Sequence, residues 1–471
     1  MTASRIGLII GALALLAAMV MPAPAGMSRE ALIVAGLVVL MAAWWMTEAI
    51  PLTATALMPF IILPLAGVMG AKDTASAYYA PILFLLLGGA FLALAIERTG
   101  LHRRLSLAIL KAVGSTGGQS RLLLAFMLST GILSMLISNT ATALIMMPMA
   151  LAVLAGGGMK AGDTDGLSGA LPMGIAFAAS IGGLGTIVGS PTNGIAVALL
   201  DDMLGMKISF AEWMAYGVPL VLIGVPLAAF IIARVQRVAA HPFDVAAARA
   251  AIEDHAPWTS AERRLLPVIA LAFAAWVTQL WVAPLLPADS WTDGTIAVIA
   301  ALALFLIPDG TGRPLLLWHE ADRAPWAVIM MFGGGLALAA GMETSGLAGW
   351  LGQVLLPLAS VPLIVVALAV VAMVILVTEF ASNVATASGI MPVIASLAAA
   401  LGLGEQAILL ALPAAMAASW GFILPSGTGP NAIAWSTGHI RMARQVQAGA
   451  WLDVAGLFLI VATVWIVAAI I

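Results

Sequence analysis

The sequence lacks cysteine altogether and contains little charge. Of its 471 residues 9% are charged and 63% are hydrophobic, and the net charge is −3. The absence of cysteine excludes disulfides, thiol catalysis and thiolate metal sites. No run of basic residues is interleaved with aromatics, so no nucleic-acid partner is expected. A soluble domain carries about 25% charged residues, and so little charge cannot cover a water-facing surface of this size.

What the sequence has instead is apolar runs from end to end, interrupted by Gly, Pro, Ser, Thr and Asn. Such runs cross a lipid bilayer as helices of about 20 residues, so we expect an all-α polytopic membrane protein. Residues 118–158 and 357–400 are predicted to be re-entrant hairpins, which enter and leave on one side. The eleven predicted spans lie near 6–21, 31–46, 51–69, 80–96, 169–200, 214–233, 265–286, 294–308, 325–342, 405–435 and 451–471.

Lys and Arg are unevenly placed around these spans. With the N-terminus in the cytoplasm, Arg29, Lys72 and Lys207 fall outside the cell, and the remaining 16 of the 19 Lys and Arg fall inside. Positive charge concentrates on the cytoplasmic side of membrane proteins. The bias therefore predicts a multi-pass protein of a bacterial-type inner membrane with a cytoplasmic N-terminus.

Three further segments allow two interpretations. Residues 1–25 also fit a signal peptide with a small-residue cleavage site, but we favour a retained helix because further spans follow directly. Residues 100–114 and 234–253 place basic positions beside apolar faces. They are predicted to be interfacial helices, with ordinary cytoplasmic loops as the alternative.

The two halves of the chain resemble each other. The basic segment 98–121 of the first copy is predicted to be cytoplasmic, whereas its counterpart at 343–365 carries no Lys or Arg and is predicted to be external. Inverted repeats of this kind build secondary transporters, with binding sites near the midplane at the repeat interface. The matching stretches are 88–101 with 334–347, 138–148 with 382–392, Ala178-Ala179-Ser180 with Ala417-Ala418-Ser419, and 193–196 with 431–434.

Each half places polar residues inside its apolar regions. Ser138-Asn139 and Ser382-Asn383 lie at the hairpins, and two Gly/Pro/Thr-rich breaks at 189–193 and 427–431 end in Asn. Broken helices expose N–H groups that suit a carboxylate or sulfate, and C=O groups that suit Na⁺ together with Ser and Asn oxygens. A bound cation would help to form an electropositive site, which couples anion binding to cation binding. The simpler interpretation of one Ser-Asn pair is an interhelical hydrogen bond.

Acidic residues within apolar regions are functional candidates. We interpret Glu97 and Glu343 as residues at span ends. Glu379 could belong to a cation site or a proton step, or it could satisfy backbone donors of the hairpin. The pair Trp44-Trp45 is interpreted as an interface anchor. Because no nucleophile–base pair, metal cluster or phosphate loop occurs at membrane depth, an enzyme and an organic cofactor are not expected. A passive channel would not need two cation-type motifs.

Several of these stretches also carry a family resemblance. They are WWMTEAIPLTATALMP at 44–59, SNTATALIMMP at 138–148, GTIVGSPTN at 185–193, TEFASNVATASGIMP at 378–392 and PSGTGPN at 425–431. Through them the chain resembles the divalent anion/sodium symporter family of dicarboxylate, citrate and sulfate carriers. The resemblance implies a homodimer whose protomers have a scaffold and an elevator-type transport domain. The implied divisions are 1–116 and 234–356 for the scaffold with an interfacial arm, and 117–233 and 357–471 for the transport domain.

The resemblance also implies which residues bind. One sodium site would use Ser134, Ser138, Asn139 and Gly189, and the other Thr378, Ala381, Ser382, Asn383 and Gly427. The anion would contact Ser138, Asn139, Thr140, Ser190, Ser382, Asn383 and Thr428. The chain departs from the family pattern where Val384 replaces a threonine and where Thr192 and Gly429 replace prolines, which bears on substrate identity more than on sodium binding.

The sequence thus predicts a carrier that couples inward Na⁺ movement to uptake of a C4-dicarboxylate such as succinate, malate or fumarate. The alternatives on the same fold are an anion exchanger that Na⁺ does not drive, and a carrier of citrate or sulfate.

Overall fold

The computed structural model describes residues 3–114, 117–159, 162–250 and 257–471, which are helical and free of strands apart from one isolated bridge. The longer helices are α1 (Ala3–Val20), α2 (Arg29–Thr47), α4 (Met58–Leu65), α6 (Ile82–Thr99), α7 (Leu101–Gly114), α8 (Gln119–Ser134), α9 (Asn139–Gly156), α10 (Leu167–Gly183), α11 (Pro191–Leu204), α12 (Phe210–Val235), α14 (Ser260–Val282), α15 (Asp293–Leu306), α17 (Trp326–Thr344), α18 (Leu347–Leu355), α19 (Leu363–Phe380), α20 (Asn383–Ala400), α21 (Ile408–Ala417), α22 (Gly429–Ser436) and α23 (Met442–Ala468). The shorter elements are α3 (Leu52–Thr55), α5 (Ala71–Ala77), α13 (Val245–Ala250), α16 (Trp318–Ala321) and the 3₁₀ turns η1 (Ile187–Gly189), η2 (Val238–Ala240), η3 (Ala283–Leu285), η4 (Leu356–Ser360) and η5 (Gly404–Ala407).

Ten helices of the described residues are long and apolar enough to cross a membrane, which confirms the polytopic all-α class. They include α9, α19 and α20, three arms of the two hairpins that were predicted not to cross the membrane. They leave out 167–204 and 404–436, where a break divides each predicted span into shorter helices. The number of these helices, ten, therefore cannot be compared directly with the eleven predicted spans, because the two sets contain different segments.

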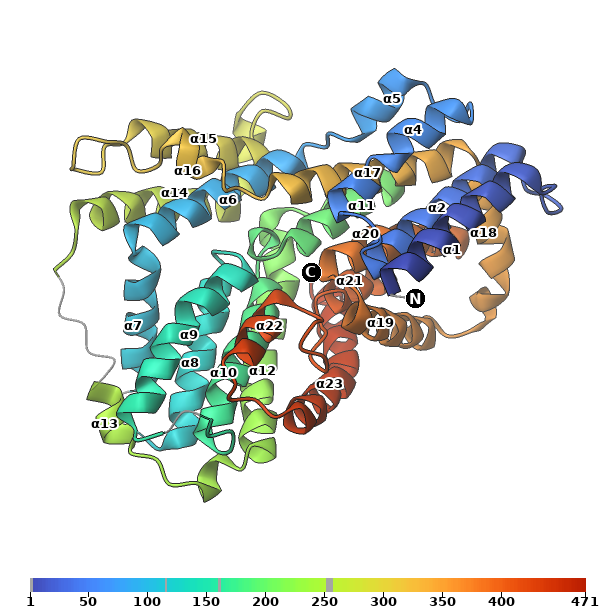
Figure 1. Ribbon diagram of the computed structural model, residues 1–471. Coiled ribbons are helices and arrows are strands. Elements are labelled where there is room, and N and C mark those ends of the chain that lie inside the picture. The colour runs from blue at the N-terminus through green and yellow to red at the C-terminus, as the bar shows by residue number, and fades with distance from the viewer. Residues whose placement is uncertain (1–2, 115–116, 160–161, 251–256) are drawn as a thin grey trace.

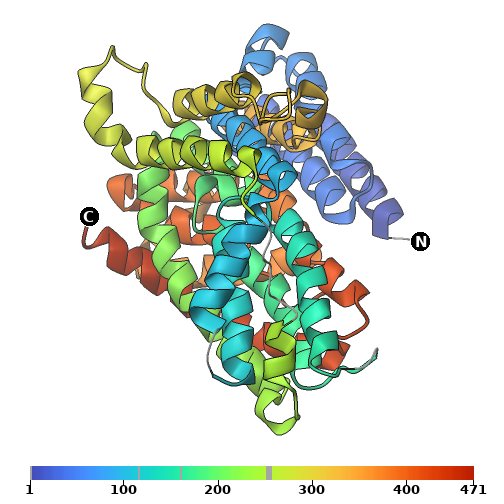
Figure 2. The same ribbon diagram turned by 90° about the vertical axis from the view of Figure 1, so that its left-hand side faces the viewer.

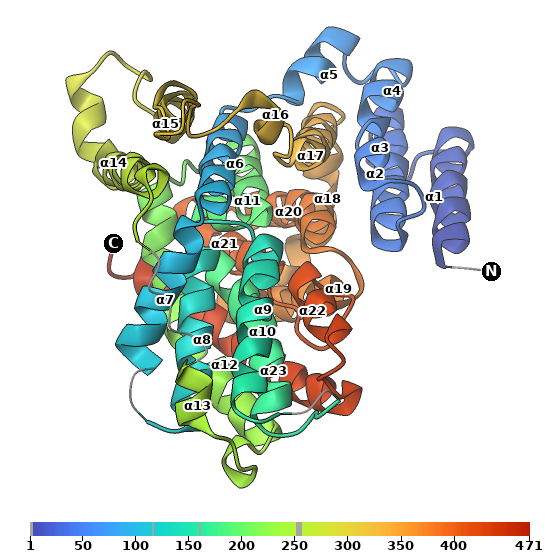
Figure 3. The same cartoon turned by 60° about the vertical axis from the view of Figure 1, so that its left-hand side comes forward.

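The helices form a row set against a bundle. Figure 3 shows α14, α15, α6, α17, α2 and α1 as the row, with α6 packed on α15 and α1 packed on α2. Below it α8, α9, α10 and α12 lie side by side (Figure 1), and α12 also packs on α23. Figure 2 shows α14 and α15 stacked above the bundle from a second direction. Helices α11 and α20 pack on each other and reach α17, so they connect the two groups.

The buried apolar side chains form two separate cores. A smaller one joins α1, α2, α4, α17 and α18, and a larger one holds the bundle together with α6, α14 and α15. The interpretation of the Trp44-Trp45 pair as an interface anchor is wrong for Trp45, which is 1% exposed in the smaller core and donates its indole N–H to the Leu52 carbonyl at 3.1 Å. Trp44 donates to the Leu8 carbonyl at 3.3 Å.

The internal repeat is also present in the structure. Helix α6 ends at Gly100, whose N–H donates to the Glu97 carbonyl, and α7 follows it. The second half repeats this pattern: α17 ends before Gly346, whose N–H donates to the Glu343 carbonyl, and α18 follows it. Both glycines take left-handed backbone conformations, with φ of 80° and 79°, which glycine adopts without steric cost. The first interfacial segment predicted at 100–114 coincides with α7.

The second segment predicted as interfacial, 234–253, is not one continuous helix. Helix α12 runs on to Val235, and η2 and the short α13 follow it. Residues 251–253 of this segment, and Lys160 of the charge count, lie outside the described residues.

Candidate functional site

Two short turns reverse the chain at the Ser-Asn motifs. Ser138 stands before α9 in an extended conformation, and its hydroxyl accepts the backbone N–H of Ala141 at 3.3 Å. Ser382 repeats this arrangement before α20, where it accepts the N–H of Ala385 at 3.3 Å. A serine in this position caps a helix because its oxygen satisfies one of the free N–H groups of the first turn. Each motif therefore lies at the positive end of a helix.

The two asparagines are held in matching ways. The Ser134 hydroxyl lies 2.8 Å from an atom of the Asn139 amide and 2.7 Å from the Ala179 carbonyl oxygen. In the second half Thr378 donates to Oδ1 of Asn383 at 2.9 Å and lies 2.7 Å from the Ala418 carbonyl. Each hydroxyl thus joins a hairpin to the helix before a break, and each site gathers hydroxyl, amide and carbonyl oxygens.

The amide of Asn139 has a mixed environment. The amide atom nearest to Ser134 also lies 3.1 Å from the Ala179 carbonyl oxygen and 3.2 Å from the Gly189 carbonyl oxygen. A nitrogen in this position would donate to all three oxygens. An oxygen there would complete a cluster of four oxygens that repel one another unless a cation neutralises them. Hard cations bind such oxygen clusters, so Ser134, Asn139 and Gly189 can together hold Na⁺.

At each break an asparagine side chain donates hydrogen bonds to two backbone carbonyls. Asn193 on α11 donates through Nδ2 to the Gly183 carbonyl at 2.7 Å and the Thr186 carbonyl at 2.8 Å. Asn431 on α22 donates to the Gly421 carbonyl at 3.4 Å and the Leu424 carbonyl at 3.1 Å. These bonds satisfy carbonyls that the broken helices leave free, which lets irregular backbone exist at membrane depth.

Other buried polar atoms next to the breaks have no partner among the described groups. They occur in symmetric pairs: the hydroxyls of Ser180 and Ser419, and the Oδ1 atoms of Asn193 and Asn431. The two serines are fully buried, and they follow the repeated Ala-Ala whose carbonyls face the Ser-Asn motifs. Buried polar groups are normally hydrogen-bonded, so symmetric exceptions mark these positions as functional candidates.

The two halves meet where the first hairpin touches the second break. The Thr140 hydroxyl lies 2.6 Å from the position that a Cβ atom would take on Gly429. Thr428 caps α22 by accepting the N–H of Asn431 at 3.2 Å. Thr140 and Gly429 both belong to the first turn of a helix, so the positive ends of α9 and α22 are adjacent. Two helix N-termini in one place favour an anion.

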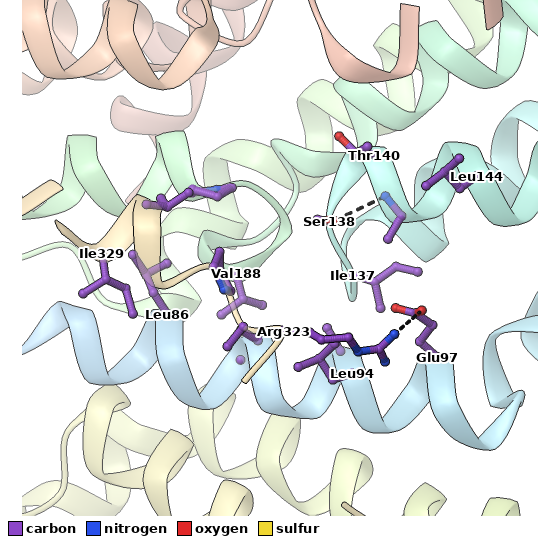
Figure 4. A pocket seen from close by; sticks show the side chains of 18 of the residues that line it. Leu86, Leu94, Glu97, Ile137, Ser138, Thr140, Leu144, Val188, Arg323 and Ile329 are labelled. Carbon is purple, nitrogen blue, oxygen red and sulfur yellow. Dashed lines mark hydrogen bonds and ion pairs between the residues drawn. The ribbon is translucent and has the colours of Figure 1, made fainter. Parts of the chain in front are cut away.

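A cavity of about 410 Å³ leads to this region from one side. Figure 4 shows Ser138 and Thr140 on one wall, with Val188 and Leu86 opposite. Arg323 and Glu97 stand in the same cavity with their charged groups 3.7 Å apart, and both side chains are more than a third exposed. Arg323 was not singled out from the sequence, because it lies in a connection far from the four motifs.

The predicted residues fall into groups. Ser134, Asn139 and Gly189 are brought together, as are Thr378 and Asn383. Ser138 and Thr140 line the cavity, whereas Ser382, Asn383 and Thr428 do not. Ser190 and Gly427 are buried in the breaks, and Ala381 is the residue between α19 and Ser382. Binding by these residues remains a prediction.

The two breaks are tied to their hairpins by different chemistry. Thr186 donates its hydroxyl to the Met135 carbonyl at 2.6 Å in the first half. In the second half Glu379 accepts the backbone N–H groups of Ile423 at 3.0 Å and Leu424 at 2.9 Å. Glu379 therefore does bond to backbone donors, but these donors belong to the second break and not to the hairpin, as the sequence had suggested.

The chain is similar to known proteins over nearly its whole length. The family described as the sodium:sulfate symporter transmembrane region matches residues 3–471. The chain is 37% identical to the sodium-dependent dicarboxylate transporter SdcS of Staphylococcus saprophyticus, over 98% of this chain and 90% of the relative. It is 36% identical to the SdcS transporter of Staphylococcus aureus, over 98% of this chain and 91% of the relative. Its fold is similar to the YdaH transporter of Alcanivorax borkumensis, with a TM-score of 0.59 at 16% identity over 94% of this chain and 98% of that one.

Proposed function

Because the chain belongs to the family of the sodium:sulfate symporter transmembrane region, we propose that it couples inward Na⁺ movement to uptake of C4-dicarboxylates such as succinate, malate or fumarate. The relatives named sodium-dependent dicarboxylate transporters support the substrate class. The observation that carries the proposal is the repeated contact of Ser134 with Asn139 and of Thr378 with Asn383, each beside a carbonyl of a broken helix.

In this proposal Na⁺ binds first at the oxygen clusters. Ser134, Ser138, Asn139 and Gly189 form one site, and Thr378, Ala381, Ser382, Asn383 and Gly427 form the other. The dicarboxylate then binds at Ser138, Asn139, Thr140, Ser190, Ser382, Asn383 and Thr428. No Lys or Arg lies in these motifs, so the helix ends and the bound Na⁺ supply the positive charge. The anion therefore binds well only when the cation is present.

The movement that carries the site across the membrane is an elevator motion of 117–233 and 357–471 against 1–116 and 234–356. The row and bundle of helices, and the cavity between them, support this division. In this proposal the carrier works as a homodimer in the inner membrane. Its N-terminus lies in the cytoplasm, an orientation that the Lys and Arg bias supports.

Uptake of radiolabelled succinate into proteoliposomes tests the function. An inward Na⁺ gradient is compared with K⁺ in its place, each with and without internal dicarboxylate. Accumulation that requires Na⁺ and no internal anion is the expected result. Uptake that requires internal dicarboxylate and ignores Na⁺ would instead identify an exchanger. If labelled citrate or sulfate is accumulated and succinate is not, the substrate assignment is wrong.

A further inference from the structure

One ion pair stands in the cavity that leads to the first Ser-Asn motif. The charged groups of Arg323 and Glu97 lie 3.7 Å apart, and their side chains are 56% and 39% exposed. Among the described residues that line the cavity they are the only charged ones, and most of the others are apolar. An anion that reaches Ser138 or Thr140 through this cavity therefore passes one basic and one acidic side chain (Figure 4).

This pair is held less tightly than the ion pairs next to it. Arg98 pairs with Asp309, which is 2% exposed, and Arg313 donates to Glu320 at 2.5 Å. The 3.7 Å between Arg323 and Glu97 is longer than a hydrogen bond, and exposed ion pairs of this kind contribute little to stability. The guanidinium of Arg323 can therefore change partners at little cost.

Neither residue stabilises the helix end beside which it lies. Glu97 is in the last turn of α6, where the helix carries a partial negative charge. Arg323 lies two residues before Pro325, the N-cap of α17, where the partial charge is positive. Both charges thus oppose the helix dipole beside them, so helix stabilisation does not explain the pair.

The internal repeat shows that the fold does not require the arginine. Residues 79–81, Tyr-Ala-Pro, precede α6 as residues 323–325, Arg-Ala-Pro, precede α17. Glu97 has its counterpart in Glu343. The acid is therefore present in both copies, whereas the arginine is present in one copy and a tyrosine takes its place in the other. Because the copies are predicted to be inverted, the arginine distinguishes one side of the membrane from the other.

We propose that Arg323 is an anion subsite, in which its guanidinium releases Glu97 and binds one carboxylate of the dicarboxylate. A guanidinium suits this ligand because it binds a carboxylate through two parallel hydrogen bonds. Glu97 competes with the anion for the same group and so prevents the subsite from retaining it. This inference rests on the proposed function.

The subsite acts on the path between the Ser-Asn region and the cytoplasm. Arg323 and Glu97 belong to the predicted scaffold, whereas Ser138 belongs to the predicted transport domain, so the subsite stays in place while the Ser-Asn motif moves. The Lys and Arg bias places it on the cytoplasmic side. When Na⁺ has left, the anion passes from the Ser-Asn region to Arg323. The guanidinium offsets part of the cost of holding a dianion between apolar walls.

Labelling of an introduced cysteine tests the subsite without transport. Because the sequence contains no cysteine, Ala93→Cys supplies the only thiol of the full-length protein. Ala93 lines the cavity one turn before Glu97 on α6. In K⁺ medium without Na⁺, at constant ionic strength, potassium succinate should slow the reaction of this thiol with an uncharged maleimide several-fold. The Ser-Asn sites bind the anion poorly without Na⁺, so protection in this medium reports the Arg323 subsite.

Matched variants assign the protection to the guanidinium. Ala93→Cys combined with Arg323→Gln should lose it. Ala93→Cys combined with Arg263→Gln, which removes an exposed positive charge that does not line the cavity, should keep it. Glu97→Gln removes the competing carboxylate and should lower the half-protecting succinate concentration several-fold. Succinamide, which has no carboxylate, should not protect.

A second reporter makes the labelling result decisive. Val328→Cys places the thiol on α17 in the same cavity, and Ala240→Cys places it at an exposed position that does not line the cavity and should react at one rate with or without succinate. Absence of protection at both cavity positions would overturn the proposal. Protection that persists with Arg323→Gln would overturn it as well.

Transport measured from each face separates the subsite from the proposed function. Whole cells expose the external face of the carrier, and inside-out membrane vesicles expose the cytoplasmic face. Arg323→Gln should raise the half-saturating succinate concentration several-fold at the cytoplasmic face and leave it nearly unchanged at the external face. If both values stay unchanged while uptake requires Na⁺, the subsite has no part in transport. If protection depends on Arg323 but uptake ignores Na⁺, the subsite stands and the proposed sodium coupling fails.

Discussion

The hydroxyl of Thr140 lies 2.6 Å from the position that a Cβ atom would take on Gly429. This contact joins the first hairpin of one repeat to the second break of the other. Gly429 therefore leaves room for the Thr140 side chain, and a side chain at 429 would force either Thr140 or α22 to shift.

Gly429→Ala should weaken anion binding. A contact under 3 Å forces α22 or Thr140 to shift, and overpacking of this kind costs about 1–3 kcal/mol. We expect the KM for succinate to rise by about tenfold or more, because 1.4 kcal/mol corresponds to a factor of ten. Gly349→Ala is the control, since an added Cβ meets nothing within 4 Å there. An unchanged KM in Gly429→Ala would separate Thr140 and Gly429 from the anion site.

Asn139→Ala and Asn383→Ala should each abolish Na⁺-driven uptake and leave the protein folded. Each change removes the side-chain amide that contacts Ser134 or Thr378, and with it a proposed ligand of Na⁺. Proteoliposome uptake measures the loss, and monodisperse elution in detergent checks the fold. Gln406→Ala removes an exposed amide and should transport normally. Robust transport by either asparagine variant would remove that residue from the site.

Val384→Thr should change substrate preference more than sodium dependence. Val384 follows Asn383 at the start of α20, where Thr140 follows Asn139 in the first half. A hydroxyl there adds a donor on the substrate side and leaves Thr378 and Asn383 unaltered. Competition of succinate uptake by malate, fumarate, citrate and sulfate measures the preference. The same inhibition profile in both proteins would rule out Val384 as a determinant.

The repeat made much of this site predictable from sequence. Ser-Asn pairs and Gly/Pro breaks are local signals, and their recurrence at matching positions indicated hairpins and broken helices. Helix capping by Ser138 and Ser382 follows from residue type alone, because serine oxygens satisfy first-turn N–H groups. Gly100 and Gly346 likewise lie at the ends of α6 and α17, where glycine is common because it adopts the left-handed conformation.

Contacts between distant segments were not predictable in the same way. Arg323 meets Glu97, 226 residues earlier in the chain, only through tertiary packing. Trp45 appeared to be an interface anchor because hydropathy cannot distinguish lipid from a protein core as the surroundings of an aromatic ring. Ser180 and Ser419 were matched as repeats, yet only packing reveals that their hydroxyls have no partner among the described groups.

Asp309 offers a test of stability outside the membrane-spanning helices. It lies in the connection after α15, is 2% exposed and pairs with Arg98 of α6. Burial alone would raise the pKa of Asp309. Hydrogen bonds from Thr311 and Arg98, with the charge of Arg98, outweigh it and hold the pKa at about 2, below the ordinary 3.8. A lowered pKa means that the folded state favours the carboxylate by about 2 kcal/mol.

The sign of the pH dependence follows. Because the folded-state pKa is the lower one, this contribution is fully present above about pH 4 and is lost as the pH falls towards 2. Asp309→Asn should therefore lower the melting temperature of the detergent-solubilised protein at neutral pH, and the difference should shrink as the medium is acidified. Asp322→Asn, which changes an exposed acid nearby, should have little effect at any pH. If the melting temperature of Asp309→Asn stays lower by the same amount down to the lowest pH, the substitution acts by disturbing packing and not by removing a charge.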